Sequence, residues 1–169
     1  MDIGSQLLVE LSRRNTDFIA HYIGKDTEKF HQLMDLLFNG KSPIPQRAAW
    51  VVTHIAEKYP ELCLPFIEPI ILNLEKFDHT GIHRCLLRFI AEMDIPESLQ
   101  GILYDICYRW LINKESPIAV KVHCMQILYN ISEIEPDLKH ELRLIFGELI
   151  DHDSAGLRSK SRHLMERLQ

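Results

Sequence analysis

The stretch PIPQRAAWVVTHIAEKYPEL, residues 43–62, decides the fold, because its basic residue recurs along the chain at a fixed step. Arg47 is followed by Arg84, Lys121 and Arg158, and each interval is 37 residues. Four positions before each base lies a residue suited to the first turn of a helix: Pro43, Thr80, Pro117 and Ser154. A fixed period of this size is typical of proteins built from stacked helical repeats.

Apolar residues recur at helical spacing along most of the chain. In residues 26–38, for example, Phe30, Leu33, Met34 and Leu37 form an apolar stripe on one side of a helix. The pattern predicts a first helix in each repeat over residues 26–38, 61–76, 97–113 and 137–150. It predicts a second helix in each repeat over residues 44–58, 81–93, 118–132 and 155–168. Two shorter helices are expected at residues 4–13 and 16–22.

The predicted fold class is all-α, a right-handed superhelix (solenoid) of about four helix pairs with an N-terminal helical cap. At 169 residues the chain is long enough to form one domain with a substantial core. We predict the cap at residues 1–25 and the repeats at residues 26–59, 60–95, 96–135 and 136–169. The second helix of the last repeat carries the polar run Ser159 to Arg162, which suits the outer face of a terminal repeat.

Two resemblances rest on this repeat. The segment Gln46-Arg47-Ala48-Ala49-Trp50, followed by the turn Pro60-Glu61-Leu62, resembles the HEAT-repeat family over about residues 26–169. That resemblance implies a stack of helix pairs that serves as a scaffold for other proteins. The same segment resembles a group of small HEAT-like proteins sometimes labelled adenylosuccinate lyase. We do not expect that activity, because the lyase has a Ser-rich catalytic loop of the SSxMPxKxNP type that this sequence lacks.

Composition points to a cytoplasmic protein. No apolar run approaches the roughly 18 residues needed to span a membrane, and the first residues carry no basic region of the kind that opens a secretion signal. The formal net charge of −5 disfavours a general nucleic-acid binder, which normally presents a basic surface. We therefore expect a protein partner and no membrane association.

The sequence predicts no catalytic residues, no metal and no cofactor. It contains no glycine-rich phosphate loop and no HExxH or GxSxG motif. His79 and His83 straddle a predicted helix start, and His140-Glu141 is the one His-Glu pair, whereas metal hydroxylases that resemble this fold repeat such pairs. The cysteines form no CxxC motif and are expected to be buried, reduced thiols: Cys63, Cys85, Cys107 and Cys124.

The basic column has two interpretations. In the first, each base bonds acids or carbonyl oxygens in neighbouring turns and sets the register of the repeats, as is typical of HEAT-like arrays. In the second, the bases form a strip on the concave face that holds an acidic partner. Arg47, Trp50 and His54 would add an aromatic part to it, because they share one face of their helix. The candidate binding residues are Arg47, Trp50, His54, Arg84, Arg88 and Lys121.

Acidic residues gather where one predicted repeat passes to the next. Some of them suit the first turn of a helix, where a carboxylate interacts favourably with the helix dipole. The others predict a negative rim along one edge, which either aids solubility or docks a basic protein surface. The residues of this acidic rim are Glu57, Glu61, Glu92, Asp94, Glu97, Glu133, Glu135 and Asp137.

The hypothesis that these patterns favour is a non-catalytic module that binds another protein through the second helices of its repeats. The alternative is a HEAT-like enzyme or DNA glycosylase that binds nucleic acid in a concave groove. Asp105 with Tyr104, Tyr108 and Trp110 is the carboxylate and aromatic set that such a site would need. Association of the chain with itself is a third alternative.

Overall fold

The computed structural model describes residues 1–168, and this range contains helices and connecting turns but no strand. The chain divides into two compact units, Met1–Phe89 and Ile90–Gln169. We call them unit 1 and unit 2 and describe each by itself. The predicted all-α class built from HEAT-like helix pairs is confirmed. The predicted division into repeats stays a prediction.

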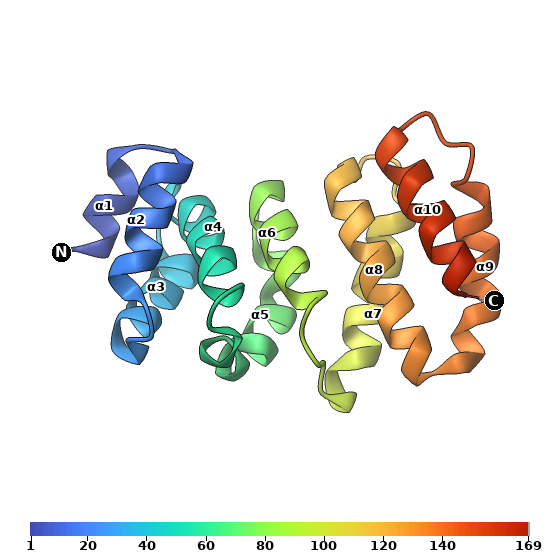
Figure 1. The fold of residues 1–169 in the computed structure, drawn as a ribbon, viewed down its shortest axis with the longest axis horizontal. Helices are drawn as coiled ribbons and strands as arrows, with labels where there is room; N and C mark the ends of the chain where they lie inside the picture. Colours follow the sequence, from blue (N-terminus) through green and yellow to red (C-terminus); the bar gives the residue numbers. More distant parts are fainter. Residues whose placement is uncertain (169) are drawn as a thin grey trace. The chain divides into compact units, whose positions relative to one another are not determined.

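Unit 1 contains six helices, of which α2, α4 and α6 lie on one side while α3 and α5 lie behind them (Figure 1). The helices are α1 (Ile3–Val9), α2 (Arg13–Ile23), α3 (Thr27–Asn39), α4 (Ile44–Ala56), α5 (Ile67–Asn73) and α6 (Thr80–Ile90), whose last residue lies just beyond the unit boundary. Unit 2 contains α7 (Glu97–Ile112), α8 (Ile118–Ile134), α9 (Lys139–Glu148) and α10 (Ala155–Arg167).

The first two helices differ from the expected residues 4–13 and 16–22 because side chains fix their starts. The Asp2 carboxylate accepts a hydrogen bond from the Ser5 amide at 2.7 Å, so α1 begins at Ile3. The Ser12 hydroxyl accepts from the Asn15 amide at 3.1 Å, so α2 begins at Arg13, three residues earlier than expected. The two helices form a hairpin that packs on α4.

The core of unit 1 follows the apolar stripe seen in the sequence. Phe30, Leu33, Met34 and Leu37 of α3 are all buried, as the helical spacing predicts. They pack with α4, the closest neighbour of α3 in this unit. The Asp26 carboxylate caps the start of α3 by accepting from the Lys29 amide at 3.1 Å.

The continuous helix predicted over residues 61–76 is wrong. Only α5, Ile67–Asn73, is α-helical there, and short 3-10 turns precede and follow it: Pro60–Leu62, Leu64–Phe66 and Leu74–Lys76. Pro65 and Pro69 explain the break, because proline has no amide hydrogen to donate to the preceding turn and its ring crowds that turn. The segment still buries Ile67, Ile70 and Ile71.

Unit 2 is built on the α7–α8 pair, with α10 packed against both α8 and α9. The predicted starts of α7 and α8 agree with the structure, where Pro96 and Pro117 occupy the N-cap positions. One residue of the polar run in the last repeat departs from expectation. Ser161 is fully buried, and its hydroxyl donates to the Phe146 carbonyl of α9. It therefore joins α10 to α9 instead of facing outward.

All four cysteines are buried and free, as predicted. Burial raises the pKa of the Cys63 thiol to about 12 and the pKa of the Cys107 thiol well above its ordinary value. Such thiols stay protonated and behave as small apolar side chains in the core.

Candidate functional site

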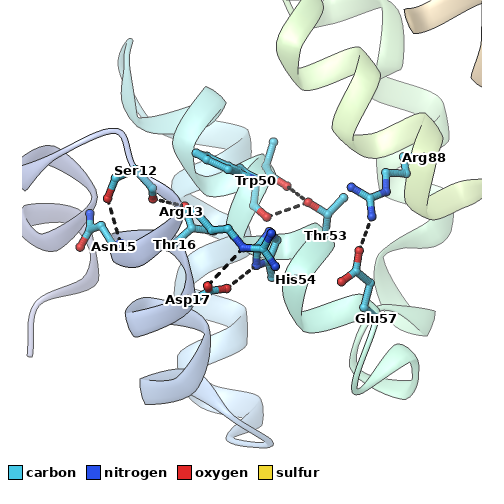
Figure 2. Close-up of polar contacts among 11 residues, drawn as sticks. Ser12, Arg13, Asn15, Thr16, Asp17, Trp50, Thr53, His54, Glu57 and Arg88 are labelled. Atoms are coloured by element: carbon cyan, nitrogen blue, oxygen red, sulfur yellow. Dashed lines mark hydrogen bonds and ion pairs between the residues drawn. The ribbon is translucent and has the colours of Figure 1, made fainter. Parts of the chain in front are cut away.

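Polar and aromatic side chains gather on one surface of unit 1, where α2, α4 and α6 lie side by side. We call this surface the α2–α4–α6 face. Figure 2 shows most of its residues, and Arg84 lies one helical turn before Arg88 on α6. The residues of the face are Arg13, Asp17, Trp50, His54, Glu57, Arg84 and Arg88.

A pair between Asp17 and His54 joins α2 to α4 on this face. His54 Nδ1 lies 2.7 Å from Asp17 Oδ1, and Arg13 Nε lies 3.6 Å from the other carboxylate oxygen (Figure 2). The hydrogen bond to His54 is the main reason that the pKa of Asp17 is below its usual range. The His54 side chain is only 15% exposed, and its contact with Asp17 holds the imidazole in place.

Trp50 lies next to this pair on the surface of α4. Its ring meets the His54 ring edge-on, with centroids 6.0 Å apart and planes at 87°. Its own backbone carbonyl accepts from the Thr53 hydroxyl at 2.7 Å (Figure 2). Trp50 is neither buried nor fully exposed. Part of the indole therefore faces solvent while the His54 ring supports it.

A second ion pair joins α4 to α6. Arg88 Nη2 lies 2.5 Å from Glu57 Oε1, and both side chains are more than half exposed (Figure 2). Exposed pairs of this kind contribute little to stability, because water competes for both charges. The pair can therefore open at little cost when another charged group approaches. Arg84 is also exposed and makes no ion pair within residues 1–168.

The four bases of the 37-residue column do not share one environment. Arg47 Nη1 donates to the Leu7 carbonyl of α1 at 2.7 Å. Arg158 Nη1 donates to the carbonyls of His152 and Asp153 at 2.7 and 2.8 Å. These two bases thus bond backbone oxygens, as the structural interpretation of the column expects.

Lys121 differs from the other candidate binding residues, because it is buried and only 8% exposed. A partner on the surface has little access to it. We therefore exclude Lys121 from the candidate site. Arg47 is also tied to α1, because its guanidinium bonds the Leu7 carbonyl.

The eight residues of the predicted acidic rim are all exposed, but they are divided between the two units. Two of them are paired with bases of their own unit, Glu57 with Arg88 and Glu133 with Lys139 at 2.6 Å. In unit 2, a hollow of about 410 Å³ has Glu92, Asp94 and Glu133 in its lining. A second hollow of about 370 Å³ has Glu97 and Glu135 in its lining. That the eight residues form one rim stays a prediction.

Two of the residues suggested for a glycosylase, Tyr104 and Asp105, do not line the same side of α7 in unit 2. Asp105 is 67% exposed on α7, and Arg109 Nε lies 3.0 Å from its carboxylate. Tyr104 lines the second hollow of unit 2, but Asp105 is not among the residues lining it. Neighbouring helix positions point about 100° apart, which explains the separation.

Two negative findings complete the description of residues 1–168. No group of three or more His, Cys, Asp or Glu side chains lies close enough together to hold a metal ion. Every helix in this range is too short or too polar to cross a lipid bilayer.

Acid should weaken the contact that the Asp17–His54 pair makes between α2 and α4. The folded chain holds the pKa of Asp17 below its value of about 3.9 in an unfolded chain. The stability that the Asp17–His54 pair contributes is therefore present above about pH 4 and is lost as the pH falls through the lower, folded pKa. We expect Asp17→Asn to lower the urea midpoint at pH 6 and to leave it unchanged relative to wild type at pH 2.

His54→Ala serves as the matched control for that experiment. It removes the other side chain of the pair. Asp17→Asn should therefore lower the urea midpoint much less in the His54→Ala background than in wild type. Simple addition of the two effects at pH 6 would show that the pair contributes nothing.

Comparison with known proteins identifies a family for the chain. No curated protein and no solved structure matches the chain significantly. A family model described as a HEAT repeat domain matches residues 3–168. The match begins in α1, so it extends beyond residues 26–169 to the helices predicted as a cap. Together with the paired helices of both units, this match shows that the chain belongs to the HEAT-repeat family.

Proposed function

We propose that the chain is a non-catalytic module that binds another protein, and that the partner docks on the α2–α4–α6 face. The observation that carries the proposal is the partly exposed Trp50, supported by a histidine that Asp17 holds in place. HEAT-repeat arrays typically mediate protein interactions, so the family supports the general role. The specific face is inferred from the residues that line it.

Trp50 has the properties of an interface anchor. Tryptophan and arginine are the side chains most enriched among residues that dominate binding energy, and this face carries one indole beside several guanidinium groups. An indole already held against His54 loses little conformational freedom when a partner covers it. The Trp50 side chain is thus already ordered before the partner binds.

We also propose a cellular location and a class of partner for the module. Buried thiols without disulfides fit a reducing compartment, so we place the module in the cytoplasm. The net charge of −5 supports a protein partner over nucleic acid.

The test is a cross-link formed at the face itself. Benzoylphenylalanine introduced in place of Trp50 should, on illumination in cells of the native host, form an adduct with one specific protein. The same group in place of Ile112, which is 55% exposed on α7 of unit 2, is the control. In co-purification with the protein so identified, Trp50→Ala should lower recovery about tenfold or more. Equal adducts at both positions, or no adduct at Trp50, would show that this face is not the docking surface.

A further inference from the structure

We infer that the segment docking on the α2–α4–α6 face is an acidic stretch of a partner protein that carries an apolar residue for Trp50. This inference rests on the proposed function and adds the chemistry of the partner. Its basis is the charge on the face, the exchangeable Arg88–Glu57 pair, and the position of Trp50 beside them.

The face carries a surplus of positive charge on a chain whose formal net charge is −5. Its bases are Arg13, Arg84 and Arg88, and its carboxylates are Asp17 and Glu57. Both carboxylates already contact bases of the same face, Asp17 with His54 and Arg13 and Glu57 with Arg88. What remains for a partner is the exposed guanidinium of Arg84, which makes no ion pair within residues 1–168, together with the unused donors of Arg88. A guanidinium has five N–H donors, and two can bond one carboxylate side by side.

Glu57 occupies the place that a partner's carboxylate would take. Its Oε1 lies 2.5 Å from Arg88 Nη2, and it reaches across from α4 to α6. Because the pair is exposed on both sides, an incoming carboxylate can replace Glu57 or share Arg88 with it. Glu57 therefore acts as an internal competitor, and its removal should strengthen binding.

The arrangement sets the spacing that the partner needs. Arg84 and Arg88 lie one turn apart on α6, so about 6 Å separates the points where they hold carboxylates. Trp50 lies on the neighbouring helix, and packed helices are about 8–10 Å apart. An extended segment rises about 3.3 Å per residue. An apolar residue and an acidic residue about three positions apart would reach both helices.

The same charges disfavour a nucleic acid. A nucleic-acid backbone presents a phosphate at every nucleotide, and Asp17 and Glu57 lie among the bases that would have to contact it. Separate carboxylates on a peptide can meet the arginines and avoid these two acids. The face therefore matches an acidic protein segment better than a polyanion.

The experiment is selection of binders from a random peptide library of about 12 residues, a length that covers the three helices when extended. The full chain is the target, and the affinities of the selected peptides are measured by fluorescence anisotropy. We expect the peptides to be enriched in Asp and Glu with one aromatic or aliphatic residue. Arg84→Gln should weaken binding about tenfold and Glu57→Gln should strengthen it about threefold. Lys114→Gln, an exposed base of unit 2, should change nothing.

Different results would contradict the inference and the proposed function. Peptides that need Trp50 but show no acidic enrichment, or that bind equally well to Arg84→Gln, would overturn the inference and leave the docking face intact. Recovery of no peptide, or of peptides indifferent to Trp50→Ala, would instead overturn the docking face. An oligothymidylate of about 12 nucleotides is tested as a competitor. If it displaces the peptides at a concentration below the one at which they bind, the partner is a nucleic acid and not an acidic protein segment. Unchanged thermal unfolding of each variant shows that the fold is intact.

Discussion

Replacing Phe30 with alanine is expected to lower the free energy of unfolding by about 3–5 kcal/mol, which is the largest effect we foresee for a single change. Phe30 is fully buried on α3, and its ring meets the edge of the Phe66 ring, with centroids 5.6 Å apart and planes at 71°. The substitution removes the transfer energy of the ring, opens a cavity and breaks this aromatic contact. A loss of this size is a large part of the total stability of an ordinary domain.

Urea denaturation followed by far-ultraviolet circular dichroism measures this loss. Phe18→Ala is the matched control, because Phe18 belongs to the same unit but is 53% exposed on α2. We expect its effect to stay within about 0.5 kcal/mol. Equal losses for the two variants would mean that the α3 stripe does not form the core of unit 1.

The second large effect is expected from Asn15→Ala, at about 2–3 kcal/mol. Asn15 is 6% exposed and joins α1 to α2 through three hydrogen bonds of its side chain. Its Oδ1 accepts from Gln6 Nε2 at 2.7 Å, and its Nδ2 donates to the carbonyls of Gln6 and Glu10 at 2.9 and 3.0 Å. Alanine leaves these partners without a protein hydrogen bond in a partly buried place. Because α1 has only seven residues, it depends on tertiary contacts such as these to persist as a helix.

Hydrogen exchange shows whether Asn15→Ala weakens only the contact between α1 and α2 or destabilises the whole of unit 1. Protection of the α1 amides should fall in Asn15→Ala more than protection of the α3 amides. Asn15→Asp should be as harmful, because it places a carboxylate against two carbonyl oxygens. Asn39→Ala, at an exposed asparagine that bonds Asp35, is the control. Uniform loss of protection across unit 1 would contradict the local role.

The helix pairs were predictable because their boundaries depend on local signals. The start predicted for the second helix of the third repeat, residue 118, is the observed start of α8, since Pro117 precedes it and cannot itself extend a helix backward. The stretch over residues 61–76 was mispredicted because its apolar spacing is helical throughout. Pro65 and Pro69 outweigh that spacing, since each removes a backbone donor.

The candidate site was only partly predictable. The rings of Trp50 and His54 meet on α4, but the partner of His54 was missed. Asp17 precedes His54 by 37 residues, so extending the repeat step into the first two helices would have found it. Exposure could not be obtained from the period, because it depends on contacts that differ between repeats. Lys121 and Arg84 share the column, yet one is buried and the other exposed.

The four buried cysteines have a practical consequence for measuring the binding proposed above. All four sulfurs are enclosed in the core, so a maleimide dye added to the folded chain will not reach them. A single cysteine introduced at an exposed position, such as Arg14→Cys on α2, becomes the one site of attachment. A fluorophore placed there lies on the helix next to Trp50 and would convert the otherwise native chain into an optical sensor of its own partner.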